Sequence, residues 1–211
     1  HHGSVPLIGG IGMFIGVFFG LISLNFLILE DNLTIYQKYY ESFQNLYFLI
    51  LSSFILIIIG IVDDFKNVSH KVRFLFQVVA ALILILFGDV LLHDLGSLFS
   101  SNNIYLGPFS IVFTIFAIIG VLNSLNFSDG IDGLSASLSI ITFLAVSFFA
   151  YQGNNLFALN VALFFIFSIF AFLIFNIGVG KSSIFKIFMG DAGSTFLGLG
   201  VAWTLISFSQ G

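Results

Sequence analysis

Three short polar segments interrupt an otherwise apolar chain, and each carries aspartate beside glycine or asparagine. They are VDDFKN, with Asp63 and Asp64; NSLNFSDGIDGL, with Asp129 and Asp132; and FMGDAGST, with Asp191. Carboxylate and amide oxygens are the ligands that Mg²⁺ and Mn²⁺ prefer, and Mg²⁺ usually joins one or two carboxylates to substrate phosphates. The residue types therefore point to metal-assisted chemistry on a phosphorylated substrate.

Each segment also has an ordinary structural explanation. Asp63 and Asp64 could form an acidic turn that nearby lysines neutralise, and either aspartate of the second segment could cap a helix or occupy an Asp-Gly turn. In the third segment, Gly190 and Ser194 could simply mark a helix start, although exposed N–H groups at such a start also bind phosphate. One segment of this kind carries little weight, whereas three on one side of a membrane carry much more.

The rest of the chain has the composition of a multi-pass membrane protein. Of its 211 residues, 59% are hydrophobic and only 8% are charged, which is too few to cover the surface of a soluble domain. We expect an all-α fold, because open sheet edges leave backbone groups unpaired in lipid. The net charge of −4 offers no basic surface, so nucleic acid is not expected as a partner, and the absence of cysteine excludes disulfides.

Apolar runs of spanning length predict about seven transmembrane helices. They lie near residues 7–29, 46–62, 72–92, 107–123, 134–152, 156–177 and 194–208. The last run is short enough to be a partial span. We expect the seven helices to form one transmembrane catalytic domain over residues 1–211.

An odd number of passes decides which connections share a side of the membrane. If the first residues are cytoplasmic, so are the segments 63–71, 124–133 and 178–193, while 30–45, 93–106 and 153–155 lie outside. Five of the six Lys and Arg residues then lie inside and only Lys38 outside, as the positive-inside rule requires. All five aspartates of the three polar segments fall on the cytoplasmic side.

Four linked motifs carry a resemblance to a known family: HHGSVPLIGG, GIVDDFKNVSHKVRFLFQ, NSLNFSDGIDGL and IFMGDAGSTFLG. In their order, spacing and topology the chain resembles the polyprenyl-phosphate N-acetylhexosamine-1-phosphate transferase family, over essentially its whole length. Within the family it is most similar to the branch that transfers N-acetylglucosamine-1-phosphate to undecaprenyl phosphate.

The resemblance implies an activity and a location. A sugar-1-phosphate would pass from a UDP-sugar to undecaprenyl phosphate with release of UMP, in the presence of Mg²⁺ or alternatively Mn²⁺. This step initiates cell-surface polysaccharides such as O-antigen or enterobacterial common antigen. The enzyme would be a multi-pass protein of the bacterial inner membrane with its active site facing the cytoplasm, and a homodimer is left open.

The resemblance also implies a role for each candidate residue. Asp63 and Asp64 match the pair beside the lipid phosphate, and Asp129 and Asp132 match the pair that lines the nucleotide-sugar pocket. Metal ligands are implied at Asn126 and Asp191; substrate contacts are implied at Phe188, which would pack on uracil, and at Asn123, Gly190 and Ser194. His2 and His70 match no catalytic position.

The Asp63 and Asp64 pair is often cast as a base for the lipid phosphate. A phosphate monoester has a second pKa of about 6 and is already mostly dianionic at neutral pH, so a base would contribute little. We expect the pair to orient the phosphate instead, with positioning and charge neutralisation supplying most of the rate.

The chain departs from the family in what it lacks. Members of the family carry an additional first helix, further helices after the last motif and a histidine-rich cytoplasmic loop. The 211 residues contain none of these, so we expect a partial protein that does not turn over by itself.

Other functions stay open at this stage. A transporter would bury its carboxylates near the membrane midplane, often at broken helices, rather than at helix ends. A CDP-alcohol phosphotransferase carries Ala-Arg after Asp-Gly, whereas DGIDGLSASL contains no arginine. Within the favoured family the sugar could be another UDP-N-acetylhexosamine, such as a 6-deoxy sugar or the muramoyl-pentapeptide.

Overall fold

The computed structural model describes residues 5–31, 33–97, 103–178 and 186–210, except for the side chains between 25 and 43. In this part of the chain it has seven α-helices and one short 3-10 helix, η1 (Gly107–Phe109). The α-helices are α1 (Gly9–Asp31), α2 (Leu33–Lys66), α3 (His70–Phe87), α4 (Ser110–Ser128), α5 (Leu134–Gln152), α6 (Leu156–Asn176) and α7 (Gly190–Gln210).

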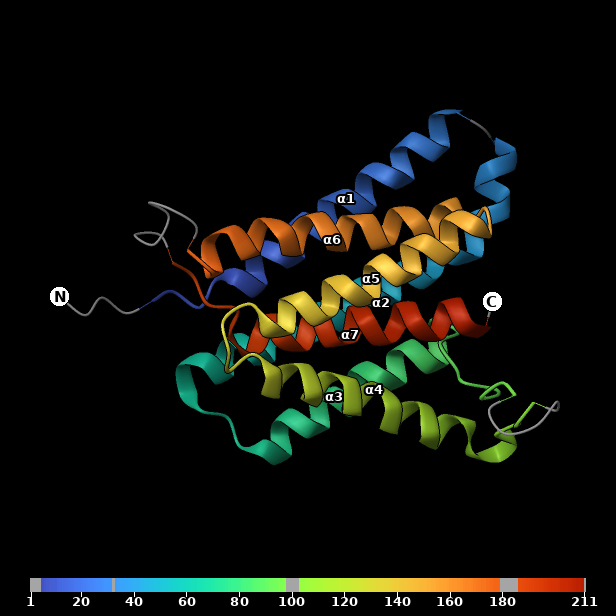
Figure 1. Ribbon diagram of the computed structural model, residues 1–211. Coiled ribbons are helices and arrows are strands. Elements are labelled where there is room, and N and C mark those ends of the chain that lie inside the picture. Colours follow the sequence, from blue (N-terminus) through green and yellow to red (C-terminus); the bar gives the residue numbers. More distant parts are fainter. Residues whose placement is uncertain (1–4, 32, 98–102, 179–185, 211) are drawn as a thin grey trace.

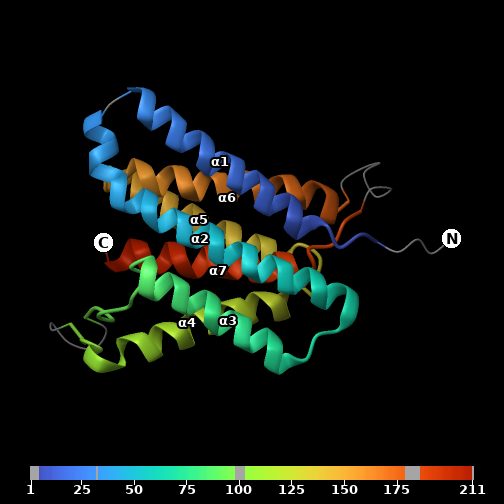
Figure 2. The ribbon, with the colours of Figure 1, turned by 180° about the vertical axis from the view of Figure 1, so that it is seen from behind.

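The predicted all-α membrane fold is confirmed. Six of the helices are long and apolar enough to cross a membrane, and the shorter apolar stretch Gly9–Leu24 belongs to α1. The described residues contain no β-strand, only an isolated bridge between Asp94 and Tyr105 in the connection from α3 to η1. Figures 1 and 2 show the helices running roughly along one direction as a bundle.

Three predicted boundaries were wrong. Helix α2 begins at Leu33 rather than near 46, because residues such as Gln and Lys favour helix without being apolar. Helix α3 ends at Phe87 rather than near 92. Gly88 caps it, and the next residue, Asp89, takes a left-handed φ of 50°. Helix α7 begins at Gly190, which places Asp191 in its first turn.

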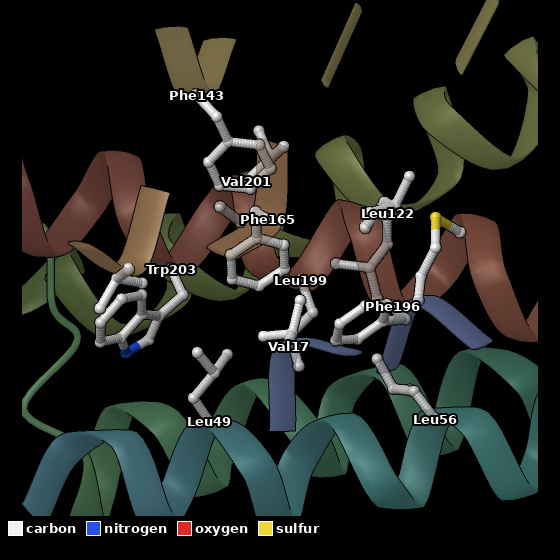
Figure 3. Close-up of a cluster of buried hydrophobic side chains, with 14 of the residues drawn as sticks. Val17, Leu49, Leu56, Leu122, Phe143, Phe165, Phe196, Leu199, Val201 and Trp203 are labelled. Atoms are coloured by element: carbon white, nitrogen blue, oxygen red, sulfur yellow. The ribbon is translucent and has the colours of Figure 1, made fainter. Parts of the chain in front are cut away.

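Helix α7 is the centre of the bundle and a complete span, which corrects the prediction of a partial one. Buried residues make up 78% of its most apolar stretch, against 28–39% in the other five candidate spans. It packs against α1, α2, α4, α5 and α6. Figure 3 shows Phe196 and Leu199 of α7 among large apolar side chains of its neighbours, including Phe165, whose ring centroid lies 5.5 Å from that of Phe196.

Small residues let the neighbouring backbones approach the start of α7. A Cβ added to Gly10 of α1 would overlap the backbone of Gly193, and one added to Gly60 of α2 would overlap the backbone of Ala192. Close approach of this kind is the usual basis of helix packing in membranes. It brings α1 and α2 against the turn of α7 that carries the Gly-Asp-Ala-Gly sequence.

The three acidic segments meet at one end of the bundle. In Figure 1 the end of α2, the turn between α4 and α5 and the start of α7 all lie at the left, the same end as the start of α1. The end of α1, the start of α2 and the turn between α5 and α6 lie at the opposite end, as does the end of α7. This arrangement confirms that the three segments share one side of the bundle.

Candidate active site

A cavity of ≈ 420 Å³ opens where the three acidic segments meet. Seven of the ten candidate residues line it: Asp64, Asn126, Asp129, Asp132, Phe188, Gly190 and Asp191. Leu7, Gly130, Asn176 and Met189 complete the lining. The other three candidates, Asp63, Asn123 and Ser194, lie behind its wall, and His2 falls outside the described residues.

Gly190 and Asp64 fix the position of Asp191. Gly190 starts α7 with a φ of 73°, which glycine adopts without a Cβ clash, and a Cβ here would also lie 2.7 Å from Asp64 Oδ2. The turn aims the backbone N–H of Asp191 at Asp64 Oδ1, which accepts a hydrogen bond of 2.9 Å. A carboxylate from the end of α2 thus caps the start of α7, where the helix dipole favours negative charge.

Asn126 links α4 to the same turn of α7. Its Nδ2 donates to Asp191 Oδ1 and, over 2.8 Å, to the Ser194 hydroxyl. Ser194 is fully buried, and its hydroxyl lies within hydrogen-bond distance of the Gly190 and Asp191 carbonyl oxygens. The structure therefore gives Ser194 a supporting place behind Asn126.

Arg73 of α3 is the residue that sequence reasoning missed. Its Nη1 lies 2.8 Å from Asp63 Oδ2, and its Nη2 donates to Asn126 Oδ1 over 3.1 Å and to Asp191 Oδ1 over 3.4 Å. One guanidinium thus joins the ends of α2, α4 and α7. A signal existed in the sequence, because Arg73 and Gln77 are two polar residues spaced by four in an apolar helix and must share a face.

Asp63 is a buried anchor for this arginine. Its side chain is only 5% exposed, and its Oδ1 accepts a 2.7 Å hydrogen bond from the backbone N–H of Val68. The chain can turn back at this point because Asn67 takes a left-handed φ of 48°. The acidic turn, the ordinary structural explanation of this segment, is therefore present as well, but the cation paired with Asp63 is Arg73 rather than a lysine.

Gln77 and Asn123 form a second polar link between α3 and α4, one turn deeper in the bundle. Asn123 Nδ2 donates to Gln77 Oε1 over 3.0 Å, and Gln77 Nε2 donates to Asn123 Oδ1 over 3.3 Å. Gln77 is buried. The pair stabilises the helix contact that holds Arg73 opposite Asn126.

Phe188 lines the cavity, and Lys186 lies beside it. The Phe188 side chain is partly exposed, and the Lys186 ammonium lies 5.1 Å from the centre of its ring. The same ammonium pairs with Asp132 Oδ2. An exposed flat ring with a cation beside it suits a planar heterocycle next to phosphate groups.

The segment that carries Phe188 is held from two sides. Its backbone N–H donates to the Pro6 carbonyl over 2.9 Å, and its carbonyl accepts from Gly9 over 3.0 Å. From the end of α6, Asn176 Nδ2 donates to the Ile187 carbonyl over 2.9 Å. The approach to α7 is therefore a fixed part of the cavity.

The electrostatics of the cavity are dominated by negative charge. Burial raises the pKa of the Asp129 carboxyl to about 7, and the charges of three surrounding aspartates add to the increase. Asp129 directly follows the last residue of α4, so its carboxyl lies outside the membrane-spanning helix. A negatively charged substrate would be repelled by these aspartates unless a cation offset the charge.

The residues present fit a divalent cation that is shared with a substrate. Asp64 Oδ2 is buried and lacks a hydrogen-bond partner in the described part of the chain, and it lines the cavity together with Asn126 and Asp191. No three His, Asp or Glu side chains of the described residues lie close enough to hold a metal alone. Mg²⁺ typically binds through one or two carboxylates plus substrate phosphates, which matches this donor set.

Comparison with known proteins identifies similar sequences. Residues 46–209 match the profile of the family described as glycosyl transferase family 4. An undecaprenyl-phosphate alpha-N-acetylglucosaminyl 1-phosphate transferase of Escherichia coli O157:H7 is 33% identical over 214 residues, covering 100% of this chain and 53% of the relative. Proteins of the same description from Yersinia pestis and Haemophilus influenzae are 32% and 33% identical, over all of this chain and 53% and 55% of theirs. The chain spans about half the length of these curated relatives.

Proposed function

The chain belongs to glycosyl transferase family 4, and on that premise we propose that its protein transfers N-acetylglucosamine-1-phosphate from a UDP-sugar to undecaprenyl phosphate and releases UMP. The resemblance drawn from the four sequence motifs is confirmed at the level of the family. The named relatives act on undecaprenyl phosphate and N-acetylglucosaminyl 1-phosphate, and the proposal extends this chemistry to the present chain.

One observation carries the proposal: aspartates from the ends of three helices line one cavity that also presents an aromatic ring. The cavity volume of ≈ 420 Å³ lies in the range of small-molecule sites, and its polar groups converge from α2, α4 and α7. A transporter site would be expected near the midplane, whereas this cavity lies at the end of the bundle.

The donor diphosphate would lie against Asp64, Asn126 and Asp191. When bound there, Mg²⁺ would neutralise charge on the diphosphate and on the departing UMP. Asp191 and Asn126 are the proposed ligands. Asp64 would hold Asp191 in place through the backbone hydrogen bond and supply the unpaired Oδ2.

The uridine and the sugar would occupy the outer part of the cavity. Phe188 offers a partly exposed ring for the uracil, and base stacking on an aromatic ring contributes about 1–3 kcal/mol in nucleic-acid complexes. Asp129 lines this part of the cavity, and burial raises its pKa to about 7 before any ligand binds. Asp132 pairs with Lys186 at the rim.

The chemical step would be a displacement at the β-phosphorus of the donor. An oxygen of the lipid phosphate forms the new P–O bond, the bond between the β-phosphorus and the bridging oxygen breaks, and that oxygen leaves as part of UMP. No proton must be removed, because the lipid phosphate is mostly dianionic above its second pKa of about 6. Asp63 would act through Arg73, which it holds beside Asn126 and Asp191.

The location is part of the proposal. Four of the six Lys and Arg residues, Lys66, Lys71, Arg73 and Lys186, lie at the end of the bundle that carries the cavity, which favours a cytoplasmic position for that end. An inner-membrane enzyme with this orientation would meet UDP-sugars where they are made and would start a cell-surface polysaccharide.

A panel of donors tests the proposal. The protein is expressed from its complete open reading frame, purified in detergent and supplied with undecaprenyl phosphate, Mg²⁺ and one UDP-sugar at a time. We expect UMP release with UDP-N-acetylglucosamine to exceed that with the UDP-muramoyl-pentapeptide or a UDP-6-deoxy-N-acetylhexosamine. A preference for either of the other donors would keep the reaction class and replace the sugar, and no UMP release with any donor would contradict the proposal.

A further inference from the structure

Arg73 touches both side chains proposed as metal ligands. Its Nη2 donates to Asn126 Oδ1 over 3.1 Å and to Asp191 Oδ1 over 3.4 Å. The guanidinium thus supplies positive charge at the place where the proposed function requires a divalent cation. Two cations at one set of oxygens repel each other, and the repulsion is strong where water is partly excluded.

The two ends of the guanidinium are held unequally. Nη1 lies 2.8 Å from Asp63 Oδ2, and Asp63 is itself buried and fixed by the Val68 N–H. The Nη2 contacts are longer, and Asp191 is 31% exposed. The contact with Asp63 is therefore the anchor, and the contacts with Asn126 and Asp191 are the ones that can be released.

We propose that Arg73 exchanges partners: it holds Asn126 and Asp191 until a divalent cation takes their oxygens, and its freed Nη2 then binds a substrate phosphate. The exchange rests on the proposed function, because it needs the metal and the phosphorylated substrate. Asp63 would keep the arginine at the site throughout.

The exchange gives the site an order of events. While Nη2 is bound to Asn126 and Asp191, it is not free to bind a phosphate, and the carboxylates keep the cavity negative, so an anion binds poorly. Cation binding changes both conditions together. Arg73 thus couples cation binding to phosphate binding, which would limit unproductive binding of nucleotides without metal.

An arginine with a purely structural role predicts something different. In that case its loss would loosen the contacts between α2, α4 and α7 and weaken cation binding. The exchange predicts the opposite sign, since loss of Arg73 removes a competitor for the ligand oxygens. The sign of the change in cation affinity separates the two.

The test uses Mn²⁺ as a paramagnetic probe. EPR titration measures its binding to the purified protein, expressed from its complete open reading frame. We expect Arg73→Gln to bind Mn²⁺ at least about tenfold more tightly than wild type, because a nearby unit charge in a partly buried site changes affinity by this order or more. Lys186→Gln is the matched control: it removes one positive charge beside the cavity, where Lys186 pairs with Asp132 rather than with Asn126 or Asp191, so a change below about threefold is expected.

Two further variants keep the outcome decisive. Arg73→Lys retains the positive charge but lacks the two-pronged guanidinium, so it cannot bridge Asp63 to Asp191. We expect its Mn²⁺ affinity to rise by about threefold, a result that is useful even if Arg73→Gln fails to fold. Asp191→Asn should abolish Mn²⁺ binding, so that adding this variant leaves the EPR signal of free Mn²⁺ undiminished. Arg73→Gln should also lose most of the Mn²⁺-dependent gain in binding of inorganic pyrophosphate.

The outcomes distinguish this inference from the proposed function. If Asp191→Asn abolishes Mn²⁺ binding but both Arg73 variants bind Mn²⁺ no more tightly than Lys186→Gln, the exchange is overturned and the metal site stands. If Asp191→Asn binds Mn²⁺ as tightly as wild type does, Asp191 is not a metal ligand. The metal assignment then fails, and the exchange fails with it.

Discussion

Replacing Gly190 by alanine should destabilise the protein and misalign the site, although the substitution adds only a methyl group. Gly190 has a φ of 73°, and a left-handed backbone costs an L-residue about 1–2 kcal/mol. The new Cβ would also lie 2.7 Å from Asp64 Oδ2, so the Asp64 carboxylate must move away.

Movement of Asp64 would break its hydrogen bond with the Asp191 N–H, which is 2.9 Å long. A hydrogen bond to a charged group contributes about 1.5–3 kcal/mol, so together with the backbone strain the variant should lose about 2.5–5 kcal/mol of stability. Because Asp191 would lose its alignment, we also expect turnover to fall at least about a hundredfold.

The assay is SDS titration of the purified protein in mixed micelles, which reports the free energy of unfolding. Gly120→Ala is the matched control, because Gly120 lies in α4 with no atom within 4 Å of an added Cβ. Alanine there should be neutral or slightly stabilising, since it is the better helix former. The reasoning would be refuted if Gly190→Ala and Gly120→Ala unfolded at the same SDS fraction.

Three other changes test separate parts of the account. Asp129→Asn should raise the unfolding temperature in EDTA more at pH 8.5 than at pH 5. The Asp129 pKa is raised to about 7 in the folded protein, so its carboxyl costs stability progressively as the pH rises above the pKa of the unfolded state. An equal gain at both pH values would contradict the assignment. Phe188→Leu should weaken UMP binding about tenfold through lost stacking, whereas Phe167→Leu on the exposed surface of α6 should not; equal effects would remove Phe188 from the nucleotide site. A cysteine at position 66 should be labelled only from the cytoplasm and one at position 154 only from outside, and residues 1–211 contribute no cysteine of their own; labelling of position 66 from outside in intact cells would reverse the topology.

The sequence was sufficient to predict the bundle, because the apolar runs are long and lipid leaves helices as the available structure. It was less informative about where the helices end. Residues 33–45 read as a loop on hydropathy, yet their backbone is helical. Hydropathy measures preference for lipid, whereas the helix extends on backbone hydrogen bonds that need no apolar side chain.

The central position of α7 was hidden for the opposite reason. Its glycines and Ser-Thr pair lower its hydropathy, so it read as a partial span, although small residues are what allow the closest packing. Gly193 shows the point: it adds nothing to hydropathy and places α7 directly against Gly10.

The sequence placed most of the candidate residues on one side of the membrane but gave little about their arrangement around the cavity. The motifs brought Asp64, Asn126 and Asp191 to one cavity, as the topology required. Arg73 had been treated only as one of the charges that set orientation, because a turn separates it from Asp63 in the sequence. Its contacts with three helices depend on the packing of α3 against α4, which the spacing of residues does not reveal.

The central claim is that the reaction moves a sugar together with its phosphate, at a metal held through Asp191. The most direct measurement supplies UDP-N-acetylglucosamine labelled with ³²P at the β-phosphorus, undecaprenyl phosphate and Mg²⁺ to the protein expressed from its complete open reading frame. We expect the label to enter the lipid fraction in step with UMP release, and we expect Asp191→Asn to lower this transfer far more than it weakens binding of the nucleotide. Sugar in the lipid fraction without ³²P, or undiminished transfer of ³²P in excess EDTA, would contradict the account.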